Sequence, residues 1–246
     1  MTPLRACDGR LLRDFPPTWQ ALRDPPGLLC IGGDLSAERL LAGYRRGIFP
    51  WYAQGEPVLW WSPPERAVFE LDAFAPSRRL RRWLRHCDWT VRADLDFVEV
   101  MRECGRDRDD GGRGWIFADM LVAYARLHAL GHAHSIEVLD ASGTRIGGVY
   151  AVTLGAACFA ESMFSRRSNA SKVALYALAA WLRRHDIPIF DAQLPNPHLH
   201  ALGMSVWSRS RFEKQLSSLV DRCPDWPGAA WTRAFGTLRA AELAEA

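Results

Sequence analysis

The sequence predicts a mixed α/β protein in two unequal parts: a small N-terminal domain, then a larger domain in which helices flank a mixed sheet. Three observations predict this. The chain up to about Asp72 is rich in Pro, Gly and Trp, residues 134–166 hold three closely spaced strand patterns, and helices alternate with strands after them. We therefore expect a small α/β domain over residues 1–72 and a larger, catalytic domain over 73–246, which is long enough to bury a substantial core.

Composition excludes several classes of protein. Hydrophobic residues make up 48% and charged residues 24% of the chain, as in ordinary globular proteins. The apolar run 173–182 ends at Arg183 and is too short to span a bilayer. The N-terminus shows no apolar segment followed by a small-residue cleavage site. We expect a cytoplasmic protein without membrane contact.

Two helix starts are readable in the first third of the chain. Ser36 is a plausible N-cap for a helix that Gly47 ends, and Ser77 opens a second helix with an apolar stripe. Five arginines ring that stripe, which suits either a solvated helix face or contacts to nucleic-acid phosphates. They are Arg78, Arg79, Arg81, Arg82 and Arg85.

The later elements follow in a recognisable order. A polar, Gly-rich loop covers 104–115, and a helix is expected over 118–130. Strands follow over 134–140, 144–154 and 158–166, then a helix over 170–185, a buried strand over 187–194, a loop, a short strand over 204–207 and a helix from about 209. This order is similar to the latter half of the GNAT acetyltransferase fold.

The loop before the 170–185 helix argues against coenzyme A. GNAT enzymes bind its pyrophosphate on a loop of the type Q/R-x-x-G-x-G/A, whose glycines allow close approach of the backbone. Here the loop reads RRSNAS, with Asn169 and Ser171 in the glycine positions; either residue alternatively caps the helix. The acyl donor is then another activated carboxyl group, and an aminoacyl-tRNA ester suits a chain rich in Arg and Trp.

Glu161 is out of place in the buried strand CFAESMFSR. An isolated buried carboxylate is costly unless it is protonated or paired with a cation. It is therefore a candidate binding residue for a positively charged ligand.

A zinc site is not expected. The six cysteines form no C-x-x-C pair. Among the histidines, Gly131 separates His128 from His132 and His134, and no neighbouring carboxylate or cysteine completes a ligand set, so structural roles are favoured.

Long, unusual strings, in order from about Asp24 to Gly203, carry a family resemblance. They are GLLCIGGDLSAERLLAGYRRGIFPWY, LWWSPPERAV, LHALGHAHSIEV, GGVY, ESMFSR with NASK, and FDAQLPN followed by HALG. The chain resembles the bacterial leucyl/phenylalanyl-tRNA–protein transferases. The resemblance implies transfer of Leu or Phe from Leu-tRNA or Phe-tRNA to proteins with N-terminal Arg or Lys, which marks them for N-degron degradation. It implies no cofactor and no metal.

The resemblance also assigns roles to residues. Glu161 would bind the acceptor side chain, and Asp191 and Gln193 would form the catalytic pair, on one face of one strand by alternation. The alternative is that both are buried hydrogen-bonding residues of the sheet. Asn196 would be a further polar residue of the site, and Trp51 and Trp115 would line the donor end, where core packing is the alternative.

The transferred side chain needs an apolar pocket. Its walls correspond to Met163, Leu175, Leu178, Phe190 and Val149, although a helix or strand stripe looks the same in a core. Alternation puts Met163 on the face of Glu161. Val149 and Cys158 stand where some relatives have Met and Phe, which bears on the Leu:Phe preference and not on the chemistry. Two other functions remain open: a coenzyme A-dependent N-acyltransferase, and a non-enzymatic RNA- or peptide-binding adaptor.

Overall fold

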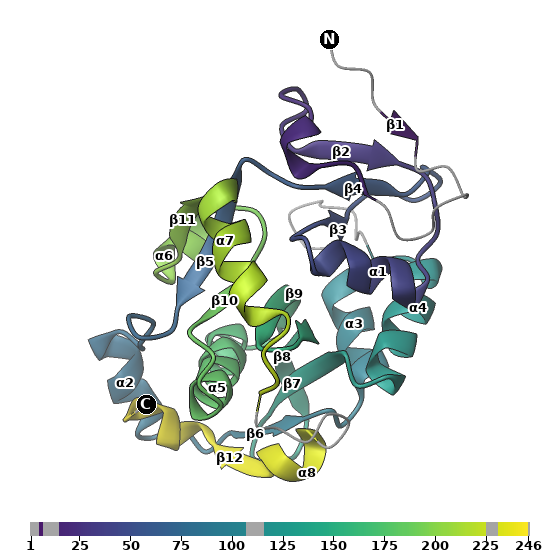
Figure 1. Ribbon diagram of the computed structural model, residues 1–246. Helices are drawn as coiled ribbons and strands as arrows, with labels where there is room; N and C mark the ends of the chain where they lie inside the picture. The colour runs from purple at the N-terminus through teal and green to yellow at the C-terminus, as the bar shows by residue number, and fades with distance from the viewer. Residues whose placement is uncertain (1–4, 7–14, 107–115, 225–230, 246) are drawn as a thin grey trace.

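The computed structural model describes residues 5–6, 15–106, 116–224 and 231–245, and places helices on both faces of an eight-stranded mixed sheet (Figure 1). The strand order is β11-β5-β10-β9-β8-β7-β6-β12; β9 and β10 run parallel, and all other neighbours are antiparallel. This confirms the predicted fold class. The strands are β5 (Glu65–Glu70), β6 (Thr90–Ala93), β7 (Ala133–Leu139), β8 (Arg145–Leu154), β9 (Ala157–Ser165), β10 (Ile189–Asp191), β11 (Ser205–Ser208) and β12 (Thr237–Arg239).

Two adjacent glycines on β8 show how the helices cover the sheet. A Cβ atom on Gly147 would lie 2.5 Å from the Cβ of Ala170 in α5 (Ala170–Arg184). A Cβ on Gly148 would lie 2.9 Å from the Phe164 ring and 3.5 Å from Val100 in α3 (Phe97–Gly105). Successive residues of a strand point to opposite faces. The sheet therefore has an α5 face and an opposite face, which α3 and α4 (Ala118–Ala129) cover (Figure 1).

The N-terminal part forms a separate four-stranded sheet with the order β1-β2-β4-β3. Its strands are β1 (Arg5–Ala6), β2 (Leu28–Ile31), β3 (Phe49–Pro50) and β4 (Leu59–Trp61), accompanied by η1 (Thr18–Gln20) and α1 (Ala37–Tyr44). The chain leaves this sheet at Trp61 and enters the larger one at Glu65. Strand β5 therefore belongs to the larger sheet, although it precedes the domain boundary that we expect near Asp72.

Local capping chemistry defines the expected helices. The Ser36 Oγ accepts a hydrogen bond from the Arg39 amide, and the Ser77 Oγ accepts one from Leu80 at the start of α2 (Arg78–Leu84). The helices expected over 118–130, over 170–185 and from 209 are confirmed as α4, α5 and α7 (Arg209–Leu219). None of the helices in the described ranges is both long and apolar enough to cross a membrane.

The structure differs from the expectation in several places. Strand β10 ends at Asp191, because Gln193 adopts a left-handed backbone with φ 58°. The loop expected after it contains α6 (Pro197–Ala201), which Asn196 caps. The loop expected from Cys104 starts inside α3. Near the C-terminus lie α8 (Trp231–Phe235), β12 and η3 (Ala240–Ala244), which show no clear pattern in the sequence.

Candidate active site

Glu161 lies at a β-bulge, and the bulge determines which way its side chain points. Tyr150 pairs with Ser162 and Ala151 pairs with Ala160, so Glu161 has no partner on β8. Its carboxylate reaches Tyr124 of α4, on the α3/α4 face. Met163 pairs with Val149, which shares the α5 face with Gly147. The expectation that Glu161 and Met163 share a face is therefore wrong, because the extra residue shifts the alternation by one position.

Burial controls the protonation of Glu161. Only 9% of the residue is exposed, and desolvation raises the pKa of its carboxyl group to about 8. Hydrogen bonding from Tyr44 lowers this pKa, Asp191 raises it, and Arg66 lowers it. Glu161 forms no ion pair with any residue in the described ranges. Without a ligand, the site therefore holds a carboxyl group that is largely protonated at neutral pH.

Polar groups from α1, α4, β8 and the loop after β10 surround this carboxyl group. The Gln193 Nε2 donates a hydrogen bond of 2.6 Å to its Oε1, and the Tyr124 hydroxyl donates a longer one of 3.4 Å to its Oε2. The hydroxyls of Tyr124 and Tyr44 are 2.6 Å apart. Because Tyr44 belongs to α1 and Tyr124 to α4, this pair joins the N-terminal part to a helix that covers the larger sheet. The buried hydroxyl of Tyr150 has no hydrogen-bond partner in the described structure.

Asp191 is 1% exposed and forms an ion pair with Arg66. The Arg66 Nε and Nη2 atoms donate to its Oδ1 and Oδ2 at 2.9 and 2.8 Å, a two-pronged arrangement. The backbone amide of Gln193 donates to Oδ1 at 3.0 Å. Asp191 and Gln193 thus lie together beside Glu161, with Asp191 paired to a guanidinium and only the Gln193 side chain directed at Glu161.

The other expected site residues have different surroundings. The Asn196 Oδ1 accepts the amide hydrogen bond of Leu199 at 2.9 Å and so caps α6. Trp51 follows β3, is 43% exposed and has its ring 5.6 Å from that of Trp61. Trp115 lies outside the described residues.

The expected pocket walls all lie in or against one hydrophobic core. Leu175 and Leu178 of α5 are buried, and Phe190 stacks on Phe69 at 4.7 Å. Val149 is buried beside its half-buried strand partner Met163. Burial alone does not separate a pocket wall from ordinary core at these five positions.

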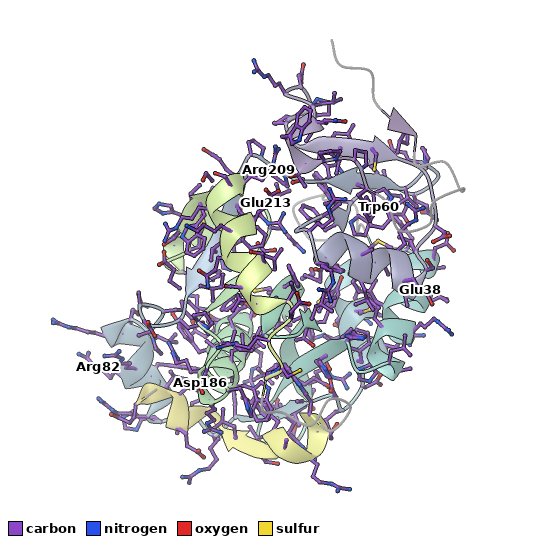
Figure 2. All side chains as sticks on the ribbon, viewed as in Figure 1. Glu38, Trp60, Arg82, Asp186, Arg209 and Glu213 are labelled. Atoms are coloured by element: carbon purple, nitrogen blue, oxygen red, sulfur yellow. The ribbon has the colours of Figure 1, made fainter. Side chains whose placement is uncertain are left out.

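The start of α5 and the arginines of α2 differ in what their hydrogen bonds leave available. At the start of α5, the amide of Ser171 donates to the Ser165 Oγ, and Asn169, with φ 74°, accepts no capping hydrogen bond. Neither Asn169 nor Ser171 therefore caps the helix, and the hydroxyl of Ser165 already accepts a hydrogen bond from one of the amides at its start. On α2, Arg78, Arg79 and Arg82 are exposed, and Arg82 lies at the outer side of the helix (Figure 2). Arg85 pairs with Glu245, and Arg81 is half-buried.

The histidines acquire a carboxylate partner that the sequence did not indicate. The Asp94 Oδ2 lies 2.8 Å from the His134 Nδ1, and His128 is close to both. The His128 Nδ1 bonds the Ala133 carbonyl at 2.7 Å, and the two rings stack on Phe97 and Trp231. The His132 Nδ1 faces the Thr153 carbonyl. The potential ligand atoms of Asp94, His128 and His134 lie within 4.8 Å of one another, so the expectation that no carboxylate joins these histidines is wrong.

Sequence reasoning missed Arg66, Tyr124 and Tyr150. Arg66 sits in the quoted string LWWSPPERAV as a lone cation entering a strand that is otherwise buried, which is a usable signal. Tyr124 lies in an ordinary helical stripe, and nothing in the sequence separates it from core.

Comparisons with known proteins identify the family of this chain. Residues 68–217 match the family model for leucyl/phenylalanyl-tRNA protein transferase, and residues 33–64 match that for its N-terminal domain. A relative named leucyl/phenylalanyl-tRNA–protein transferase from Xanthomonas axonopodis pv. citri (strain 306) is 51% identical, covering 94% of this chain and 92% of its own. One of the same name from Xylella fastidiosa (strain 9a5c) is 49% identical over 93% of each chain. Among solved structures, FemX is remotely similar, with a TM-score of 0.45 at 14% identity over 60% of each chain. The chain belongs to the leucyl/phenylalanyl-tRNA–protein transferase family.

Proposed function

We propose that this chain transfers Leu, and also Phe, from aminoacyl-tRNA to the α-amino group of proteins that begin with Arg or Lys. The product then carries an N-terminal residue that marks it for N-degron degradation, and the reaction takes place in the cytoplasm with no metal or cofactor. The observation that carries the proposal is the buried Glu161 carboxyl group, which has hydrogen-bond donors around it but no ion-pair partner among the described residues.

A cationic acceptor side chain supplies what Glu161 lacks. A guanidinium or ammonium group that displaces water from this site forms charge-assisted hydrogen bonds with the carboxylate, and the buried charge becomes paired. Ala or Ser at the acceptor N-terminus offers no such compensation. Glu161 therefore selects the first residue of the acceptor.

Gln193 lies next to Glu161 and is suited to orient the acceptor amine. The neutral α-amino group attacks the ester carbonyl carbon, the new C–N bond forms, and the C–O bond to the terminal ribose breaks. The amine gives up a proton, and the departing ribose oxygen gains one. An amide is too weak a base to take the proton, and both Asp191 oxygens are held by Arg66. These residues therefore act by positioning the amine.

The donor end is proposed from exposed aromatic and basic groups. The exposed face of Trp51 is available to stack on the terminal adenine, which contributes about 1–3 kcal/mol per base. The α2 arginines Arg78, Arg79 and Arg82 are proposed to contact tRNA phosphates, whose binding depends on salt. Val149, Met163, Leu175, Leu178 and Phe190 are proposed to contact the transferred side chain.

A direct assay tests the function. Leu-tRNA carrying radiolabelled Leu is incubated with two peptides that differ only in an N-terminal Arg or Ala. We expect label on the Arg peptide alone. Equal label on both peptides defeats the selection by Glu161, and label on neither defeats the transferase proposal. Acetyl-coenzyme A turnover without charged tRNA instead supports a coenzyme A-dependent enzyme, and tRNA binding without transfer supports an adaptor.

A further inference from the structure

Arg66 occupies the centre of the site region without touching Glu161. It is 2% exposed, and each of its three guanidinium nitrogens donates a hydrogen bond. Two go to the Asp191 carboxylate, and the third goes from Nη1 to the Gly47 carbonyl at 2.7 Å. The guanidinium carbon lies 4.9 Å from the centre of the Phe49 ring and 4.5 Å from that of Phe212.

These contacts join four segments of the chain at one cation. Gly47 follows α1, Arg66 is on β5, Asp191 ends β10, and Phe212 belongs to α7. A Cβ atom on Gly47, whose φ is 70°, would lie 2.8 Å from the Phe212 ring, so glycine is needed for this approach.

The same set of contacts fixes the backbone of Gln193. Its amide donates to the Asp191 Oδ1, and its carbonyl accepts from the amide of Ala67, the residue after Arg66. With φ 58°, Gln193 has a conformation that non-glycine residues adopt only when their surroundings hold them. That conformation directs the side-chain amide at Glu161.

We propose that Arg66 is a positioning residue: it orients the Asp191 carboxylate, which holds the Gln193 backbone so that the Gln193 amide meets the acceptor. The inference rests on the proposed transferase function for its kinetic consequence. Its structural consequence is independent of activity. Arg66 acts through Asp191 and Gln193 and contacts neither substrate.

The test replaces Arg66 with Lys, which retains the charge but has one nitrogen in place of the planar fork. We expect kcat to fall about 10- to 100-fold, because a small displacement of a positioning group is enough for such a loss. The KM values for Leu-tRNA and for the Arg peptide should change less than about threefold, as expected when ground-state binding is retained. The control is Arg145→Lys, which alters the ion pair between Arg145 of β8 and the fully buried Glu137 of β7. It should leave kcat near the wild-type value.

A double-mutant cycle separates positioning from a general structural role. If Arg66 acts through Gln193, the double variant Arg66→Lys/Gln193→Ala is about as slow as Gln193→Ala alone. Losses that multiply, or a wild-type kcat for Arg66→Lys, overturn the proposal while leaving the transferase function standing.

Hydrogen exchange of the Gln193 amide gives a readout without turnover: it should accelerate at least about tenfold in Arg66→Lys, as expected when a hydrogen bond opens more often. Unchanged exchange in a folded Arg66→Lys protein also overturns the proposal.

Discussion

The side-chain amide of Gln193 donates a 2.6 Å hydrogen bond to the Glu161 carboxyl group. The residue proposed to orient the acceptor amine and the residue proposed to select the acceptor side chain are therefore in direct contact. Under this proposal both groups would meet the first residue of one acceptor, because its α-amino group and its side chain belong to the same residue. Selection and catalysis are thus expected to depend on each other at this contact.

Replacement of Glu161 by Gln tests the selection. The amide retains an oxygen that accepts from Gln193 but removes the negative charge. Loss of a charge-assisted hydrogen bond contributes about 1.5–3 kcal/mol, so kcat/KM for Arg- and Lys-initiated peptides should fall about 10- to 100-fold. Steady-state kinetics with peptides that begin with Arg, Lys and Ala measure the effect.

The control for this variant is Glu103→Gln, which neutralises another buried carboxylate; Glu103 lies in α3 and pairs with Arg166, the residue after β9. Glu103→Gln should keep the preference for peptides that begin with Arg or Lys. In Glu161→Gln, the KM for Leu-tRNA should stay within about twofold of the wild-type value, because changes at distant sites act independently. Equal losses for acceptor and tRNA would show that Glu161 serves folding.

The raised pKa of Glu161 predicts a pH dependence of acceptor binding. Its carboxyl group, with a pKa of about 8, must lose a proton before it pairs with a guanidinium. Affinity should therefore rise as pH increases and level off above about pH 8, with a slope approaching tenfold per pH unit below it. The suitable probe is a competitive peptide that begins with 5-guanidinovalerate, which carries the guanidinium but no α-amino group to titrate.

The Glu161→Gln variant is the control for this measurement. Its inhibition constant should show little dependence on pH, although Asp191, Arg66, Tyr44 and Tyr124 still face the site. A similar slope in both proteins would assign the titration to another group.

The features that the sequence predicts well are those set by neighbouring residues. Ser36 and Ser77 cap their helices through hydrogen bonds to amides three residues away. The misplacement of Glu161 among apolar residues also needs no tertiary information, because desolvation of a carboxyl group is costly in any fold.

Features that depend on distant residues or on one extra residue were not predictable. Arg66 and Asp191 are 125 positions apart, and no local pattern pairs them. The bulge at Glu161 leaves no trace in the alternation of β9, so the sequence suggests that Met163 shares its face. The left-handed Gln193 likewise depends on Asp191 and β5, and it ends a strand that the apolar pattern alone extends to Leu194.

The arginines of α2 predict a salt-dependent contribution to tRNA binding. Replacing Arg78, Arg79 and Arg82 together with Gln should raise the KM for Leu-tRNA and reduce the slope of log KM against log salt by up to about 2–3, since each phosphate contact contributes about 0.7–0.9. Titration of Leu-tRNA binding between low and moderate salt measures this slope.

A control with the same loss of charge uses exposed arginines on other elements, Arg126, Arg184 and Arg233. If α2 contacts phosphates, the α2 variant loses more affinity than this control at every salt concentration. Equal effects would mean that the tRNA responds only to the net charge, and α2 would then be a solvated helix face.

Val149 provides the test of the proposed apolar pocket. It is 2% exposed, faces α5 and is the strand partner of Met163. Val149→Met adds bulk at this position, which should disfavour the larger Phe side chain and raise the Leu:Phe ratio of kcat/KM by about 10-fold or more, within the range of about 1–3 kcal/mol for a change of pocket volume. Competition between Leu-tRNA and Phe-tRNA for one Arg peptide measures the ratio directly.

Val91→Met is the control, because Val91 is a fully buried valine on β6, three strands away from β9 in the same sheet. Both variants overpack the core at a cost of about 1–3 kcal/mol of stability, but only the first should change the ratio. A ratio that stays constant in a folded Val149→Met protein would place Val149 in the core and the pocket elsewhere.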